Sequence, residues 1–152
     1  MLDNIGCGQY NYYMFTRAHA RKNMPEGEEV MHESGEDYIE TIYLLKKRNG
    51  SVRSIDVANE LNFSRPSVSR AVGILKDNGL ITVEDDGELV LTEAGIKTAK
   101  AVYEKHTNLT KFLMMTAGVN EEIAETDACR IEHIISPETF KGIKKYIKDH
   151  KI

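Results

Sequence analysis

The chain has 152 residues, of which 41% are hydrophobic and 29% charged, a composition that excludes a disordered or fibrous protein. Twenty basic residues stand against 24 acidic ones, so the net charge of −4 excludes a general polycation, and any surface for nucleic acid has to be local. Two cysteines exclude a disulfide framework, and no signal peptide or membrane-spanning apolar run is evident, so we expect a cytoplasmic protein with no membrane partner.

Residues 1–30 have no sustained helical period and are predicted to be an N-terminal extension, either disordered or not native. The segment Gly-Glu-Glu-Val-Met at 27–31 is what a purine-rich ribosome-binding sequence gives when it is translated. One hypothesis is therefore that Met31 is the native start. The alternative is a native flexible arm that contacts DNA through the basic side chains between residues 17 and 22.

Residues 35–62 are predicted to form two helices. Tyr38, Ile42 and Leu45 stand at i, i+4 and i+7, which is the spacing of one helix face, and an Asn-Gly pair stops this first helix. Ser54 is expected to cap a second, short helix, because a serine hydroxyl can accept a bond from an unpaired N–H in the first turn.

A third helix is predicted to begin at Ser64, with Pro66 in its first turn, where a missing N–H costs nothing. From residue 64 to 76 it holds three basic residues and no acid. Hydroxyl and guanidinium groups at a helix start are suited to phosphates and base edges in the major groove of DNA, although an isolated helix of this kind is more often a solvated face. The candidate DNA-binding residues are Ser64, Arg65, Pro66, Ser67, Ser69 and Arg70.

Two short β-rich runs, at 80–83 and 88–91, flank an Asp-Asp-Gly segment, and this pattern is typical of a β-hairpin. Three helices with a tight turn between the second and third, followed at once by a hairpin, make a winged helix-turn-helix. We therefore predict such a DNA-binding domain over residues 31–92. The hairpin tip is acidic, so it is not expected to enter a groove deeply.

The remaining residues, 93–152, are predicted to form a helical domain. A long helix opens at Thr92 and Glu93 and runs to Gly118, another covers about 120–135, and a Ser-Pro pair at 136–137 starts the last. The expected fold class is therefore mainly α with a small β-hairpin.

The spacing of potential ligands predicts a metal site. A thiol, a carboxylate and an imidazole stand at i, i+3 and i+4 in residues 129–133, so we expect them on one helix face. A mixed set suits Mn²⁺ or Fe²⁺, and the thiol adds softness that favours Fe²⁺, Co²⁺ or Zn²⁺. Each of these residues alone is more often structural, for example a cysteine as a small buried hydrophobe. The candidate ligands are Asp37, Glu40, His106, Cys129, Glu132 and His133.

Four segments carry a family resemblance: GEDYIETIYLL at 35–45, SRPSVSRAV at 64–72, GLITVEDDGELVLTEAG at 79–95 and ACRIEHIIS at 128–136. In these segments the chain resembles the diphtheria toxin repressor family of metal-dependent transcriptional regulators, especially its short branch of manganese transport regulators. The resemblance implies an amino-terminal winged helix and a helical region, at 93–152, for metal binding and dimerisation. It also implies that the metal acts as a co-repressor.

The resemblance implies metal ligation by all six candidates, but it leaves the metal open. Five match the manganese-type pattern. At Cys129 that branch usually has glutamate, whereas the iron-responsive branch has cysteine there and usually has methionine where Asp37 stands. The expected ion is Mn²⁺ or Fe²⁺, with Co²⁺ or Zn²⁺ as substitutes in vitro. A second, ancillary site is not expected, because Thr110 stands where that site would need a carboxylate.

The sequence thus predicts a homodimer that binds a near-palindromic double-stranded DNA operator and represses metal-uptake genes. It is not expected to be an enzyme, because six protein ligands leave little open coordination and no separate general base or nucleophile is evident. The alternative is a metal-independent winged-helix regulator in which the ligand-like residues serve structure. Operator affinity that a chelator leaves unchanged would favour this alternative.

Overall fold

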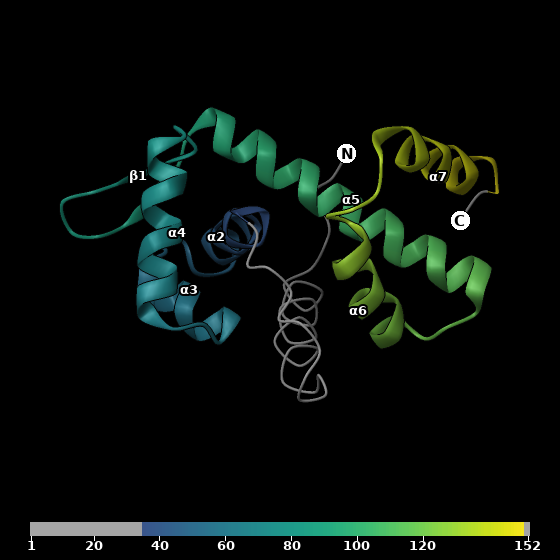
Figure 1. The fold of residues 1–152 in the computed structure, drawn as a ribbon, viewed down its shortest axis with the longest axis horizontal. Coiled ribbons are helices and arrows are strands. Elements are labelled where there is room, and N and C mark those ends of the chain that lie inside the picture. The colour runs from purple at the N-terminus through teal and green to yellow at the C-terminus, as the bar shows by residue number, and fades with distance from the viewer. Residues whose placement is uncertain (1–34, 151–152) are drawn as a thin grey trace. The chain divides into compact units, whose positions relative to one another are not determined.

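The computed structural model describes residues 35–150 (Figure 1). The chain divides into two compact units, and the boundary along the sequence falls between Lys100 and Ala101. The extension expected at residues 1–30 and the candidate start at Met31 lie outside the described residues. Each unit is described by itself below. None of the described helices is both long and apolar enough to cross a bilayer.

Within residues 35–100, the first unit contains three helices, a two-stranded antiparallel hairpin and the beginning of a long helix, in the order that the sequence predicts. The winged helix-turn-helix arrangement is thereby confirmed. The elements are α2 (Gly35–Asn49), α3 (Ser54–Leu61), α4 (Arg65–Asp77), β1 (Ile81–Val83), β2 (Leu89–Leu91) and α5 (Glu93–Ala117).

The core of this unit lies where α2, α3 and α4 pack on one another, with the hairpin against α2 and α4. Tyr38, Ile42 and Leu45 are fully buried, as their helical spacing predicts. Burial of each such side chain contributes roughly 1.5–3 kcal/mol. The rest of this apolar core is Ile39, Tyr43, Leu44, Val52, Val57, Ala58, Leu61, Val68, Val72, Leu75, Ile81 and Leu89, with Ala99 buried at the start of α5.

A three-residue turn sets the position of α4 after α3. Asn62 adopts the left-handed conformation with φ of 55°, and the N–H of Phe63 donates to the carbonyl of Ala58 at 3.2 Å. The hydroxyl of Ser64 then accepts the N–H of Ser67 at 3.3 Å, so Ser64, where the sequence predicts the helix to begin, is its N-cap. The turn therefore ends one helix and starts the next without leaving these backbone groups unpaired.

The predicted cap of α3 is wrong by one residue. Ser54 is already the first helical residue, and Arg53 is the N-cap. Arg53 is extended because it forms a β-bridge with Glu88, and its N–H donates to a carboxylate oxygen of Asp56 at 2.8 Å. The N-terminus of α3 is thus fixed by an acid inside the helix and by the hairpin, not by a serine hydroxyl.

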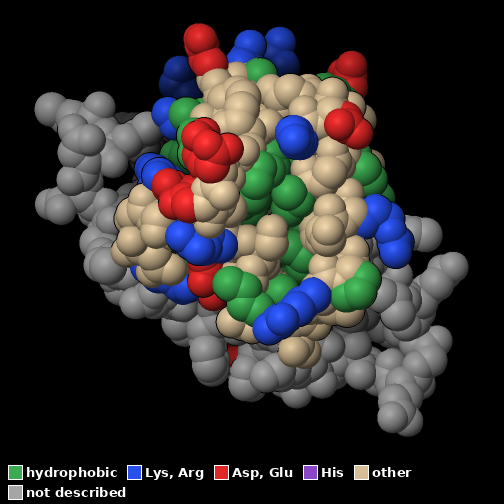
Figure 2. Space-filling model, turned by 90° about the vertical axis from the view of Figure 1, so that its left-hand side faces the viewer, with side chains coloured by type: hydrophobic (Ala, Val, Ile, Leu, Met, Phe, Trp, Pro, Cys, Tyr) green, Lys and Arg blue, Asp and Glu red, His purple; other side chains and the backbone are tan. Residues whose placement is uncertain are grey.

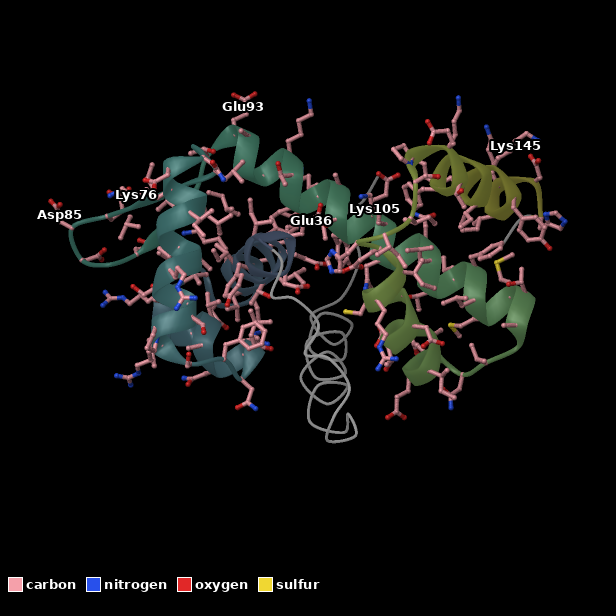
Figure 3. The ribbon with its side chains drawn as sticks, in the orientation of Figure 1. Glu36, Lys76, Asp85, Glu93, Lys105 and Lys145 are labelled. Carbon is pink, nitrogen blue, oxygen red and sulfur yellow. The ribbon has the colours of Figure 1, made fainter. Side chains whose placement is uncertain are left out.

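The hairpin pairs Ile81 with Leu91 and Val83 with Leu89. Its turn uses Gly87, whose φ of 87° lies in the region that favours glycine, and the N–H of Glu88 donates to Asp86 at 2.9 Å. Asp85 lies at the tip (Figure 3). The predicted hairpin and its acidic tip are therefore confirmed.

The base of the hairpin is joined tightly to the start of α5. The hydroxyl of Thr92 donates to the carbonyl of Gly79 at 2.7 Å and accepts the N–H of Gly95 at 3.1 Å. A Cβ atom at Gly95 would lie 1.9 Å from the carbonyl oxygen of Leu80. Only glycine at this position allows the helix to approach the hairpin backbone this closely.

We predict that Gly95→Ala lowers the free energy of unfolding by about 2–3 kcal/mol, because the added methyl group meets backbone that cannot rotate away. Gly73→Ala is the matched control. A Cβ at Gly73 meets nothing within 4 Å, so this helical substitution should stabilise the protein by up to about 1 kcal/mol. Urea denaturation of both variants measures the difference, and equal midpoints would contradict the close approach.

The second unit contains the rest of α5 with α6 (Glu121–Ile131) and α7 (Pro137–Asp149). Ser136 caps α7 through its side-chain oxygen, as the sequence pattern indicates, and Asn120 caps α6 in the same way. Phe112 of α5 meets Tyr146 of α7 edge to face at 5.6 Å between ring centroids. These three helices confirm that the fold is mainly α.

The predicted end of α6 near residue 135 is wrong by four residues. The helix stops at Ile131, and Glu132 is its C-cap, with its N–H donating to the carbonyl of Ala128 at 2.9 Å. The N–H groups of Ile134 and Ile135 both donate to the carbonyl of Ile131. The helix ends early because the chain has to turn here before Ser136 starts α7.

Candidate nucleic-acid interface and metal centre

The six candidate DNA-binding residues lie together at the start of α4, five of them in its first two turns. Ser64 is the N-cap, and the hydroxyl of Ser64 donates to that of Ser67 at 2.9 Å. Ser67 is half-buried and the other five are exposed, whereas the stripe of Val68, Val72 and Leu75 is buried. The structure therefore presents the candidates on the surface of one helix end.

The cations on α4 differ from those around the hairpin. In the described part of the chain Arg65 and Arg70 make no ion pair. By contrast, Lys46 pairs with Glu88 at 2.8 Å. Figure 2 shows the face of the first unit that is on the left in Figure 1, where hydrophobic side chains lie among basic and acidic ones.

The pairing of two hairpin acids, Asp86 and Glu88, with cations is a feature that the sequence does not predict. Lys46 and Glu88 are 42 residues apart, and Arg53 lies 3.5 Å from Asp86 across the β-bridge region. No local spacing signals either pair. Because these exposed pairs are worth only about 0–1 kcal/mol each, their main effect is on the local charge.

Three candidate metal ligands converge in the second unit. His106 on α5, Cys129 on α6 and Glu132 just after α6 are 2%, 6% and 1% exposed. One potential ligand atom from each lies within 4.8 Å of the others. This is close to the span of two metal–ligand bonds of about 2.0–2.3 Å each, so the donor set fits a single first-row ion.

Glu132 is at the centre of this group. One of its carboxylate oxygens lies 3.0 Å from His106 Nδ1, and the other lies 3.4 Å from His133 Nε2. The hydroxyl of Thr110 donates to the carbonyl of His106 at 2.9 Å, so Thr110 supports the helix behind the imidazole. A buried carboxylate needs such cationic or hydrogen-bonding neighbours, since its isolated burial is very costly.

The expectation that Cys129, Glu132 and His133 share one helix face is wrong, because only Cys129 is helical and the other two lie in the turn that follows Ile131. They are nevertheless near one another. The turn keeps Glu132 close to Cys129 and puts His133 beside the Glu132 carboxylate. Sequence spacing therefore predicts that these residues are close together, although they do not share one helix face.

Asp37 and Glu40 lie in the first unit, on α2, where both are buried. Their i, i+3 spacing on a helix is as predicted. The hydroxyl of Thr41 donates to the carbonyl of Asp37 at 2.7 Å. That Asp37 and Glu40 bind the metal stays a prediction.

We predict that His106→Ala destabilises the protein by about 3–5 kcal/mol in the presence of a chelator, because it leaves the buried Glu132 carboxylate without a main neighbour. The double variant His106→Ala with Glu132→Gln should be less destabilised than the sum of the two single variants. Chemical denaturation of all four proteins measures the coupling. Strictly additive effects would mean that the 3.0 Å contact contributes nothing.

Comparison with protein families gives two matches that together cover residues 31–89 and 92–152. The first segment matches the model described as the iron dependent repressor, N-terminal DNA binding domain. The second matches the iron dependent repressor, metal binding and dimerisation domain. The His106, Cys129 and Glu132 group falls in the second segment, and α4 falls in the first.

Individual relatives agree with these matches. The chain is 34% identical to the transcriptional regulator MntR of Escherichia coli over 115 residues, which are 76% of this chain and 74% of MntR. It is 32% identical to the diphtheria toxin repressor of Corynebacterium diphtheriae over 114 residues, or 75% of this chain and 50% of the repressor. The structure of the manganese regulator SloR is similar with a TM-score of 0.70 and 26% identity, covering 78% of this chain and 55% of SloR. The chain therefore spans about half the length of the latter two proteins.

Proposed function

Because this chain belongs to the iron-dependent repressor family, we propose that it is a DNA-binding transcriptional regulator that represses its target genes when it holds Mn²⁺ or Fe²⁺. Its predicted resemblance to the diphtheria toxin repressor family is thereby confirmed. The observation that carries the proposal is the buried group of His106, Cys129 and Glu132 in the segment that matches a metal-binding domain.

The proposed DNA-binding domain comprises residues 31–92, and the proposed dimerisation domain comprises residues 93–152. In a homodimer with two-fold symmetry, two copies of α4 face two half-sites of a near-palindromic operator. Arg65 and Arg70 at the start of α4, which make no ion pair within residues 35–150, support this assignment, since guanidinium groups at a helix end bind phosphates and base edges.

The proposed ligand set combines Asp37 and Glu40 with the group in the second unit. When bound, a divalent ion supplies positive charge and bonds to these side chains. His106, Cys129, Glu132 and His133 hold it from the dimerisation domain, while the two carboxylates of α2 hold it from the DNA-binding domain. Residues of both domains are then fixed together, so the two recognition helices lose less freedom on binding DNA. For such a mechanism, a coupling free energy of roughly 1–3 kcal/mol between metal binding and DNA binding is typical.

We extend the proposal to two finer points. A regulator of transcription acts on chromosomal DNA, so a cytoplasmic location follows from the proposed function. We also propose that it is not an enzyme, because the family models and relatives that it matches are those of repressors and transcriptional regulators.

We predict that Glu40→Ala and His133→Ala each abolish the stimulation of DNA binding by Mn²⁺ or Fe²⁺ while the protein stays folded. The operator for this measurement comes from selection of genomic fragments by the metal-loaded wild type. Glu122→Ala and His150→Ala are matched controls, since these exposed residues lie outside the ligand set and should leave the response intact.

Two outcomes would count against the proposal. If both variants respond to metal like the wild type, the ligand set is wrong. If a chelator leaves the operator affinity of the wild type unchanged, the protein is a metal-independent winged-helix regulator. Fluorescence anisotropy with labelled operator, with and without chelator, measures both.

We predict that Cys129→Glu raises activation by Mn²⁺ relative to Fe²⁺ or Co²⁺, because a carboxylate is a harder donor than a thiolate. It should also weaken the pH dependence of metal binding, since a thiol has to lose a proton before it binds a metal. Activation midpoints for the three ions on both proteins measure the change. An unchanged ranking in a variant of normal thermal stability would show that the Cys129 side chain is not a ligand.

A further inference from the structure

The exposed side of α4 has one cation at its centre. At 3.6 residues per turn, Pro66, Arg70 and Gly73 lie opposite the buried stripe of Val68 and Val72. Arg65 and Lys76 lie toward one flank of this side. The centre therefore combines a guanidinium group with positions that carry no hydrogen-bonding side chain.

Ile74 follows Arg70 by one turn and is 54% exposed, although isoleucine is usually buried. Gly73, between them, has no side chain, and a Cβ there would meet nothing within 4 Å. The backbone of α4 is thus uncovered next to Arg70 and Ile74. Asp77 ends the helix on the same side, so the last turn of α4 carries an acid as well as Lys76.

Arg70 also makes no ion pair within residues 35–150, whereas Arg48 and Arg53 both pair with acids. Its guanidinium group therefore has its donors available. Because Pro66, Gly73 and Ile74 offer no polar side-chain atoms, Arg70 is the one side chain in the middle of this surface that can form hydrogen bonds with a base.

We propose that Arg70 reads a guanine in the operator and that Ile74 contacts the methyl group of a nearby thymine. The inference rests on the proposed function and deepens it, because it names the bases that the helix selects. Guanine presents two acceptors, O6 and N7, to the fork of an arginine, and thymine presents a methyl group at the same groove edge. Arg70 and Ile74 are about 6 Å apart along the helix, which corresponds to about two base-pair steps of 3.4 Å.

The competing role for Arg70 is a contact with a phosphate. Such a contact adds affinity for every DNA sequence equally. Its removal would therefore weaken binding to all sequences alike and would lower the salt dependence of binding. A base contact instead adds affinity only where guanine is present. The two roles therefore differ in a quantity that can be measured directly, the base preference of the variant.

The test is a selection of binding sites from a random duplex pool by the full chain with Mn²⁺, followed by measurement of dissociation constants. We expect the wild type to select one guanine per half-site and to bind about 5- to 150-fold more weakly when that base pair is changed. Arg70→Ala should bind the two duplexes with similar affinity. Lys76→Ala is the matched control, and it should weaken binding to both duplexes by the same factor.

Modified bases test the atoms involved. Replacing the selected guanine with 7-deazaguanine removes N7 and should weaken binding by the wild type but not by Arg70→Ala. Replacing the nearby thymine with uracil removes the methyl group and should weaken binding by the wild type but not by Ile74→Ala. Both substituted residues are exposed, so thermal midpoints close to that of the wild type are expected.

Each result supports or overturns a defined statement. If Arg70→Ala keeps the base preference of the wild type and loses affinity for all duplexes alike, Arg70 is a phosphate contact and the inference is wrong. If Arg70→Ala loses the guanine preference but uracil has no effect, the thymine contact is wrong. If the wild type selects no sequence with or without metal, the proposed function itself fails, and the inference fails with it.

Discussion

The burial of the Glu132 carboxylate is the constraint on which the organisation of the second unit depends. A carboxylate with a fully buried side chain requires cationic or hydrogen-bonding neighbours, and α5 supplies one through His106, whose Nδ1 lies 3.0 Å from a carboxylate oxygen. The caps at Asn120 and Ser136 fix where the helices begin, so the carboxylate comes to lie beside His106 rather than in solvent. A site of this kind gains more from a divalent cation than an exposed acidic cluster does, because low local polarity strengthens the attraction.

The first unit solves a different electrostatic problem, which is to present positive charge in a chain of net charge −4. It does so by pairing acids with cations at the hairpin, as Lys46 does with Glu88, while the arginines at the start of α4 stay unpaired within the described residues. The Thr92 hydroxyl and the close approach at Gly95 hold the hairpin against the start of α5. The local charge of α4 is thus a property of the fold as much as of its sequence.

Sequence patterns predicted the elements of both units because local signals determine them. Helical spacing found the core of α2, and serine followed by proline found the starts of α4 and α7. The sequence patterns misplace helix boundaries where contacts beyond the helix determine them. Arg53 caps α3 because it bridges to Glu88, and α6 ends at Ile131 because the chain turns toward α7. The site was only partly predictable for the same reason. Spacing groups Cys129 with Glu132, but no local pattern brings His106, 23 residues earlier on another helix, to the same point.

The early end of α6 has a consequence for how ions are discriminated. Glu132 is the C-cap of α6 and His133 lies in the turn that follows, where the regular helical hydrogen bonds end, whereas Cys129 sits inside α6. In the proposed ligand set, donors at a helix end and in a turn can follow ions of different radius, so their spacing does not by itself exclude a slightly larger or smaller ion. Selectivity then has to come from the polarisability of the donors, and the helical thiol is the one soft donor of the group.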